Sequence, residues 1–120
     1  MNIDQLIAAG AIISNSLIKK PVEWKRVDDN KKKVTSTFDV FIKKSMSAAD
    51  YEFIYLNREG KEGFTARRVS RMVLLGDEGA EQIPFDLASN MHVGLLGALS
   101  AAINEVEEEN KAVETEDEKN

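Results

Sequence analysis

The sequence predicts an α+β domain in which an N-terminal segment and a β-hairpin pack with about three helices, ending in a long C-terminal helix and a disordered acidic tail. Residues 22–43 alternate apolar and polar side chains with the period of two that strands require. Residues 84–106 instead repeat apolar side chains at helical spacing. A chain of 120 residues has room for one domain with a modest core.

The N-terminal segment begins with a short helix over residues 3–9, which Asn2 can cap and Gly10 can end. Apolar side chains continue across a polar break at residues 14–16 to Ile18, and we expect the segment to lie against the core. An acid at position 4 and the lack of a leading basic region are unlike a signal peptide. No apolar run approaches the ~20 residues that span a bilayer, so we expect a soluble intracellular protein.

The β-hairpin starts at Pro21, after which Val22 and Trp24 share one side of the first strand. Residues 28–31 form the turn by composition, because Asp and Asn side chains hydrogen-bond their own backbone. The second strand covers residues 33–43 and has the most regular alternation in the chain. Two strands alone are marginally stable, so a third strand or a covering helix has to complete the sheet.

Two helices are predicted after the hairpin. Ser47 is a good N-cap for a helix over residues 48–58, which Gly60 follows as a stop. A second helix covers residues 64–75 and ends at Gly76. Apolar residues form its buried side, and three arginines share the other side: Arg67, Arg68 and Arg71.

The long helix over residues 84–106 supplies the apolar stripe on which the other elements pack. Ala88, Leu95 and Ala102 fall seven apart along it. Each glycine inside a helix costs ~1 kcal/mol relative to alanine, so the sequence allows a kink or a break near residues 91–94. The opposite side serves either close packing or an interface, because its residues are small: Gly94, Gly97, Ala98 and Ala101.

The acidic tail carries the net charge of the chain. Residues 107–120 contain seven acids and two lysines, a net charge of −5, which leaves fourteen of each sign in residues 1–106. We therefore divide the chain into a single α+β domain, residues 1–106, and a tail, residues 107–120. One Val and one Ala are its only apolar residues, so we expect the tail to be disordered or a fraying helix end. It either keeps the protein in solution or folds onto a basic partner.

Residues that support catalysis are scarce. The chain has no cysteine and one histidine, His92, which lies inside the predicted long helix and is best explained as a structural or surface residue. No transition-metal set is available, and the acidic turns lack the ligand spacing of a calcium loop. The glycines are too isolated to cradle a phosphate. We expect no catalytic residue, no cofactor and no metal, and hence no enzyme.

A basic cluster on the hairpin supports one alternative, a small nucleic-acid-binding regulatory protein. Lysine and arginine could contact phosphates, and Trp24 could stack on a base. A solvated turn explains the same residues more simply, since the body of the chain is neutral, so a nucleic-acid partner is not the expectation. The cluster consists of Lys25, Arg26, Lys31, Lys32 and Lys33.

Several short stretches, taken in order, are similar to one protein family. IDQLIAAGA at residues 3–11 is followed by PVEW at residues 21–24. The second half adds RMV at residues 71–73, DEG at residues 77–79 and a long helix that closes in INEV at residues 103–106. This order resembles the tail assembly chaperones of long-tailed, siphovirus-type bacteriophages. The hairpin departs from the family pattern because it is longer and richer in lysine.

The resemblance implies a non-enzymatic role in the cytoplasm of a bacterium that carries the phage or prophage. Such chaperones bind the tape measure protein, keep its long hydrophobic helices soluble, recruit tail tube subunits onto it, and leave before the virion is finished. Many are also made in an extended form through a programmed ribosomal frameshift, and the extension contacts the tube protein. No membrane partner is implied.

Two groups of residues are candidates for contact with a partner. The first is the small-residue side of the long helix, which also permits a homo-oligomer. The second is the arginine side of the preceding helix, which suits acidic groups. The candidates are Gly94, Leu95, Ala98, Leu99 and Ala101 in the first group and Arg67, Arg68 and Arg71 in the second.

Overall fold

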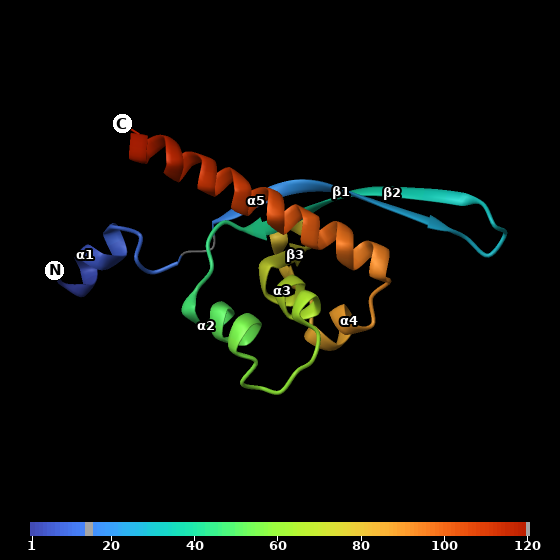
Figure 1. The fold of residues 1–120 in the computed structure, drawn as a ribbon, viewed down its shortest axis with the longest axis horizontal. Helices are drawn as coiled ribbons and strands as arrows, with labels where there is room; N and C mark the ends of the chain where they lie inside the picture. The colour runs from blue at the N-terminus through green and yellow to red at the C-terminus, as the bar shows by residue number, and fades with distance from the viewer. Residues whose placement is uncertain (14–15, 120) are drawn as a thin grey trace.

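A computed structural model describes residues 1–13 and 16–119, and within them it confirms the predicted α+β class. One antiparallel sheet has its strands in the order β1-β2-β3-β4, and the long helix α5 lies over β1 (Figure 1). The elements in chain order are α1 (Ile3–Ala8), β1 (Leu17–Val27), β2 (Lys33–Lys43), α2 (Ala48–Tyr51), the π-helix η1 (Glu52–Leu56), α3 (Phe64–Met72), β3 (Val73–Leu75), the 3₁₀ turn η2 (Asp77–Gly79), β4 (Glu81–Gln82), α4 (Phe85–Ser89) and α5 (Val93–Lys119).

β1 and β2 form the predicted hairpin and pair along their whole length. β2 has the predicted bounds, whereas β1 begins at Leu17 and not at Pro21. Pro21 is tolerated inside β1 because this is an edge strand, where one side of the backbone has no neighbouring strand to bond. The predicted turn also forms, and the Asp28 carboxylate accepts hydrogen bonds from two backbone N–H groups of the turn at 2.9 Å.

The third strand comes from residues that we predicted to be helical. α3 ends at Met72, and Val73–Leu75 form β3 beside β2, with Val73 opposite Ile42. The helix prediction is wrong over these residues because a β-branched side chain fits a strand and because the hairpin needs a third strand to be stable. Val73 is fully buried at this position.

The helix after the hairpin starts where the sequence predicts. The Ser47 hydroxyl accepts a hydrogen bond from the Asp50 N–H at 3.2 Å. α2 then passes directly into η1, which ends at Leu56 because Asn57 adopts a left-handed conformation with φ of 47°. The helix therefore stops before the predicted end at residue 58, and part of it has π geometry that the sequence pattern does not reveal.

The helix predicted over residues 84–106 is broken at residues 90–92, which separate α4 from α5. The His92 ring satisfies one backbone donor at the new start, since its Nδ1 accepts a hydrogen bond from the Gly94 N–H at 3.0 Å. The break overlaps residues 91–94, the region where the sequence allowed a kink or a break. His92 therefore lies just outside a helix and not inside one, as the sequence had predicted.

The core fills the space between the inner face of the sheet and the helices. The predicted stripe of α5 enters it through Leu99, Ala102, Ile103 and Val106, each at most 4% exposed. Burial of each large apolar side chain contributes about 1.5–3 kcal/mol, so this stripe is what holds α5 on the sheet. The other buried apolar residues are Val22, Val40, Ile42, Phe53, Ile54, Ala66, Val69, Met72, Val73, Ile83 and Ala88.

The acidic end of the chain continues α5 as a helix to Lys119, and Asn120 lies outside the described residues. Glu107 pairs with Arg68 at 3.0 Å, and the Asn110 side chain donates a hydrogen bond to the Lys44 carbonyl at 2.8 Å. The helical backbone of this segment matches the expected helix end, and the expectation of disorder stays a prediction. Extension of an existing helix by Glu, Lys and Ala costs little because nucleation is already complete. The division at residue 106 stays a prediction.

The N-terminal segment forms the predicted helix with the predicted cap, and Asn2 and Gln5 bond each other reciprocally as a capping box. Residues 1–13 do not lie against the core, however, because all of them are exposed, Ile3 at 73% and Ile12 at 60%. The end of the expected segment does reach the core, since Ile18 packs against it from β1. The inner face of the sheet is covered by α5 instead. Residues 14–15 of the polar break lie outside the described residues. Within the described part of the chain, no helix has both the length and the apolarity to cross a bilayer.

Candidate partner-binding surface

The small-residue side of α5 does not form one exposed surface. Leu99 is 1% exposed and belongs to the core, and Leu95 and Ala98 are half-buried against it. Gly94 and Ala101 are exposed. The structure therefore separates the predicted contact residues of this helix, and their role in partner contact stays a prediction.

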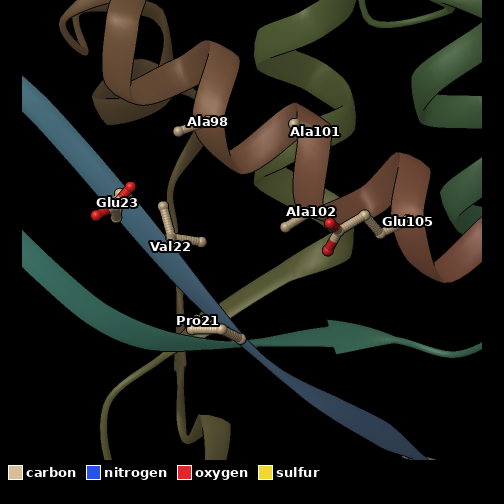
Figure 2. A pocket seen from close by; sticks show the side chains of 7 residues that line it. All are labelled: Pro21, Val22, Glu23, Ala98, Ala101, Ala102 and Glu105. Atoms are coloured by element: carbon tan, nitrogen blue, oxygen red, sulfur yellow. The ribbon is translucent and has the colours of Figure 1, made fainter.

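Three alanines of α5 face β1 across a small hollow. Ala98, Ala101 and Ala102 line a pocket of about 200 Å³ together with residues 21–23 of β1 and with Glu105. Figure 2 shows Val22 on the strand below the alanines of the helix. Alanine side chains put little bulk between the helix and the strand, so the two backbones can approach closely. Gly94 and Ala101 are exposed and a Cβ at Gly97 would meet nothing within 4 Å, so the choice between packing and an interface stays a prediction for this side of the helix.

Arg67 is buried, whereas the sequence predicted it on the exposed side of its helix. Its Nε donates a hydrogen bond to the Ile54 carbonyl at 3.0 Å, and its Nη1 donates one to the Lys61 carbonyl at 2.7 Å. A guanidinium group can be buried when several acceptors surround it, which a helical pattern alone does not reveal. Arg67 therefore ties η1 and the loop after it to α3.

Arg68 and Arg71 are also engaged inside the chain. Arg68 is 7% exposed and joins α3 to α5, with Asn104 Oδ1 at 2.7 Å in addition to Glu107. The Arg71 guanidinium lies 4.2 Å from the centroid of the Phe53 ring, a cation–π contact. The prediction that the three arginines share an exposed side is thus wrong. Their predicted role in partner contact is not tested by these contacts.

Three aromatic side chains form an exposed row from α2 through η1 to the start of α3. Tyr51, Tyr55 and Phe64 are 50%, 46% and 45% exposed. The ring centroids of Tyr51 and Tyr55 are 4.9 Å apart, and those of Tyr55 and Phe64 are 5.4 Å apart. These spacings are within the range of favourable aromatic pairs, so the three rings support one another at the surface.

A hollow of about 410 Å³ adjoins this row at Phe64. Residues 62–66, Ser89 and Leu96 line it, so that α3, α4 and α5 all contribute. Because Phe64 belongs to both features, the row and the hollow are continuous. We call them together the aromatic surface, made of Tyr51, Tyr55, Phe64 and Leu96 with the smaller residues around the hollow.

Sequence reasoning missed the aromatic surface. The available signal is a pair of tyrosines four residues apart, whose hydroxyl groups favour a position at the boundary with water, followed by Phe64. The sequence pattern gives no sign of the π-helix, which alters the direction of side chains around Tyr55. Nor does it place Leu96 of a distant helix beside Phe64.

The basic hairpin does not present Trp24 as a free stacking platform. The Arg26 guanidinium lies 4.0 Å from the centroid of the Trp24 ring, and the His92 ring is 5.8 Å away, centroid to centroid. Arg26 is itself held by a hydrogen bond of 2.9 Å to the Ser36 hydroxyl. The His92 Nδ1 already accepts the hydrogen bond from the Gly94 N–H. Among the side chains described, those of residues 1–13 and 16–112, no group of acids and histidine could hold a metal ion.

Lys20 ties the C-terminal part of α5 to β1. Its ammonium group contacts the carboxylates of Glu109 and Glu105, the latter at 3.9 Å. The hydrogen bond to Glu109 raises the pKa of Lys20 above its ordinary value of 10.5, and the two glutamate charges act in the same direction while burial opposes them. The lysine is therefore held in its charged form on the acidic side of α5.

Comparison with known proteins identifies one family. A family model described as phage tail assembly chaperone, TAC, matches residues 4–107. The match spans every element from α1 to the first residue of the acidic segment. No curated protein and no solved structure matches the chain.

Proposed function

The chain belongs to the phage tail assembly chaperones, and from this membership we propose that it binds the tape measure protein, keeps it soluble and brings tail tube subunits to it. The role is non-enzymatic. We place the protein in the cytoplasm of the bacterial host during tail assembly and outside the finished virion.

The observation that supports client binding most strongly is the aromatic surface. Soluble monomers rarely expose contiguous apolar side chains without a use for them, and partners often bind at such places. A hollow of about 410 Å³ beside Phe64 can take an apolar side chain of a client. Aromatic residues are enriched at protein interfaces because they bury much apolar area at little cost in conformational entropy.

Internal contacts hold the aromatic surface in a fixed shape. Arg67 bonds the carbonyl group of Ile54, just before Tyr55, and that of Lys61, in the loop that leads to Phe64. A surface that is already ordered loses less entropy when it binds. We propose that an amphipathic helix of the tape measure protein lays its apolar side on this surface.

The acidic end of the chain suits the other parts of the proposal. A net charge of −5 in residues 107–120 would oppose aggregation of a complex that carries hydrophobic helices. Tube recruitment is proposed from the family, and the small residues of α5 remain candidates for contact with these partners or with a second copy.

Affinity purification after co-expression tests the proposal. A tagged chain is expressed with the tape measure protein and the tube protein encoded by the same genome. We expect the tape measure protein to co-purify, and the tube protein to co-purify only when the tape measure protein is present. If the tape measure protein is absent from the purified sample, the proposal that the chain binds it is wrong. If the same amount of tube protein co-purifies with and without the tape measure protein, the proposed recruitment of tube subunits onto the client is wrong.

A further inference from the structure

The end of the β1–β2 hairpin projects beyond the start of α5 (Figure 1). The contact between Trp24 and His92 marks the point where α5 begins to cover the sheet. Past this point, residues 25–35 continue as a two-stranded ribbon and its turn. A two-stranded ribbon gains little stability of its own, so contact with a partner is one reason for the chain to extend the hairpin this far.

The outer edge of this ribbon has free backbone groups. The Lys44 N–H donates to the Ser16 carbonyl at 3.1 Å, and the Asp28 N–H donates to the Lys32 carbonyl at 2.9 Å. The register between these two ends is regular, so even-numbered residues of β1 bond β2 and odd-numbered residues face outward. Pro21 agrees with this assignment, because it is odd-numbered and its missing N–H is therefore not one that β2 would need. In the described part of the chain no strand lies on that outer side.

The side chains beside this edge combine one apolar group, two lysines and one acid, Glu23, at the end nearest α5. Val27 is 63% exposed, and Lys33 is its partner across the ribbon. Lys25 lies on the same face, since it is two residues from Val27. A hollow of about 320 Å³ lies here, lined by residues 25–27 and 33–35. An apolar side chain flanked by carboxylates would fit this arrangement.

The charges of the ribbon are not balanced within the chain. Residues 24–35 contain five cations and two acids, a net charge of +3. One of the acids, Asp28, already accepts two backbone hydrogen bonds in the turn. Among the described residues, none of the five cations forms an ion pair with an acid. Their mutual repulsion is a cost in the free protein that an acidic partner would relieve.

We propose that the outer edge of β1 over residues 23–27 receives an extended acidic segment of a partner protein. The segment adds a strand to the sheet through the N–H and C=O groups of Glu23, Lys25 and Val27. Its carboxylates meet Lys25 and Lys33, and one apolar side chain covers Val27. This site is separate from the aromatic surface and does not depend on the proposed binding of the tape measure protein.

Two other occupants fit the geometry less well. A second copy of the edge would bring lysine against lysine, and such edge charges are a known way to prevent strand pairing between copies. Single-stranded nucleic acid gains much of its affinity from stacking on aromatic rings. Here Arg26 covers Trp24 on the ribbon, so that ring is not free to receive a base.

Fluorescence anisotropy with a short labelled peptide tests the site. The probe alternates Glu and Thr around one central Val, and its control has Gln in place of each Glu. We expect the acidic probe to bind the full chain at least ~10-fold more tightly than the control. Charge reversal by Lys25→Glu with Lys33→Glu should abolish that preference, whereas Lys61→Glu with Lys111→Glu, remote from the ribbon, should leave it unchanged.

Two substitutions at Glu23 separate strand addition from simple attraction of charges. Glu23→Gln removes an acid and should tighten binding of the acidic probe or leave it unchanged. Glu23→Pro removes the same acid together with an outward N–H that β2 does not use, so the hairpin should still form but binding should weaken by ~10-fold. Circular dichroism confirms that both variants fold.

Three outcomes would overturn the proposal. One is equal binding of the acidic and Gln probes. Another is equal binding by Glu23→Gln and Glu23→Pro. The third is tight binding of a DNA or RNA oligonucleotide, lost on reversal of Lys25 and Lys33, with no binding of the acidic probe, which would assign the ribbon to nucleic acid. Co-purification of the tape measure protein is unaffected by any of them, so this proposal and the proposed function can fail separately.

Discussion

Two glycines show how differently one residue type acts at two positions. Gly79 has φ of +74°, and a Cβ there would lie 2.7 Å from Leu17 Cδ1 and 3.0 Å from Phe41 Cβ. Gly97 lies inside α5, and a Cβ there would meet nothing within 4 Å. The first glycine is required by the contact of the η2 turn with the sheet, and the second is not required by any contact.

We therefore predict opposite effects of alanine at these two positions. Gly79→Ala should lower the free energy of unfolding by about 1–3 kcal/mol, because it adds a clash and a strained backbone. Gly97→Ala should raise it by up to about 1 kcal/mol, because alanine is the better helix former. Urea denaturation of both variants measures the difference. If Gly97→Ala lowered the free energy of unfolding as much as Gly79→Ala, the open space described beside Gly97 in α5 would be contradicted.

We predict that the contribution of Lys20 to folding stability depends on pH in the alkaline range. Its pKa in the folded chain is raised above 10.5, mainly by the hydrogen bond to Glu109, so its contribution is fully present below pH 10.5. The contribution is lost as the pH rises through the folded pKa. The gap in unfolding free energy between wild type and Lys20→Met should therefore be constant near neutral pH and shrink above about pH 10.5. A gap that stays constant through that range would show that the ion pair does not form.

At the scale of elements, the helix α5 continues past its apolar stripe and makes polar contacts there. Glu107 and Asn110 contact Arg68 and the backbone of Lys44, although neither residue is apolar. Apolar periodicity predicts only the part of a helix that is held by burial. Contacts made by polar side chains at its end have no periodic signal.

Two truncations test where the domain ends. A chain that stops after Val106 should be less stable by about 1–3 kcal/mol than one that stops after Asn110, because the buried Arg68 loses a charged acceptor. The chain that stops after Asn110 should match the full-length protein closely. Thermal or urea unfolding of the three chains measures this. Equal stability of the two truncated chains would support a domain that ends at residue 106.

The elements that the sequence predicted correctly are those with a local cause. Residues 33–43 alternate over eleven positions, and Ser47 and Asn2 are good caps, so these features depend only on nearby residues. β3 was missed because its strand identity depends on pairing with β2, which lies far away in the sequence. The burial of Arg67 was missed for the same reason, since its acceptors are carbonyl groups of another segment.

At the scale of the whole molecule, the features proposed to bind partners lie on different elements. The aromatic surface is built by α2, η1, α3 and the start of α5, the basic ribbon is the end of the hairpin, and the acidic residues extend α5 (Figure 1). The chain has principal extents of 62 × 36 × 27 Å, so it can offer these surfaces to more than one partner. Sequence reasoning identified the two charged features from composition. It could not identify the aromatic surface, which exists only after folding.

The fraction of tape measure protein that stays soluble in the cell tests the central claim most directly. The tape measure protein is expressed alone, with the wild-type chain, with Tyr55→Ser and Phe64→Ser together, and with Ile12→Ser as an exposed apolar control outside both proposed binding surfaces. We predict that the wild-type chain and the Ile12→Ser control keep most of the client soluble. The double variant should remain folded and lose most of this effect, because it removes the centre of the proposed docking surface. A tape measure protein that is equally soluble with and without the wild-type chain would contradict the account.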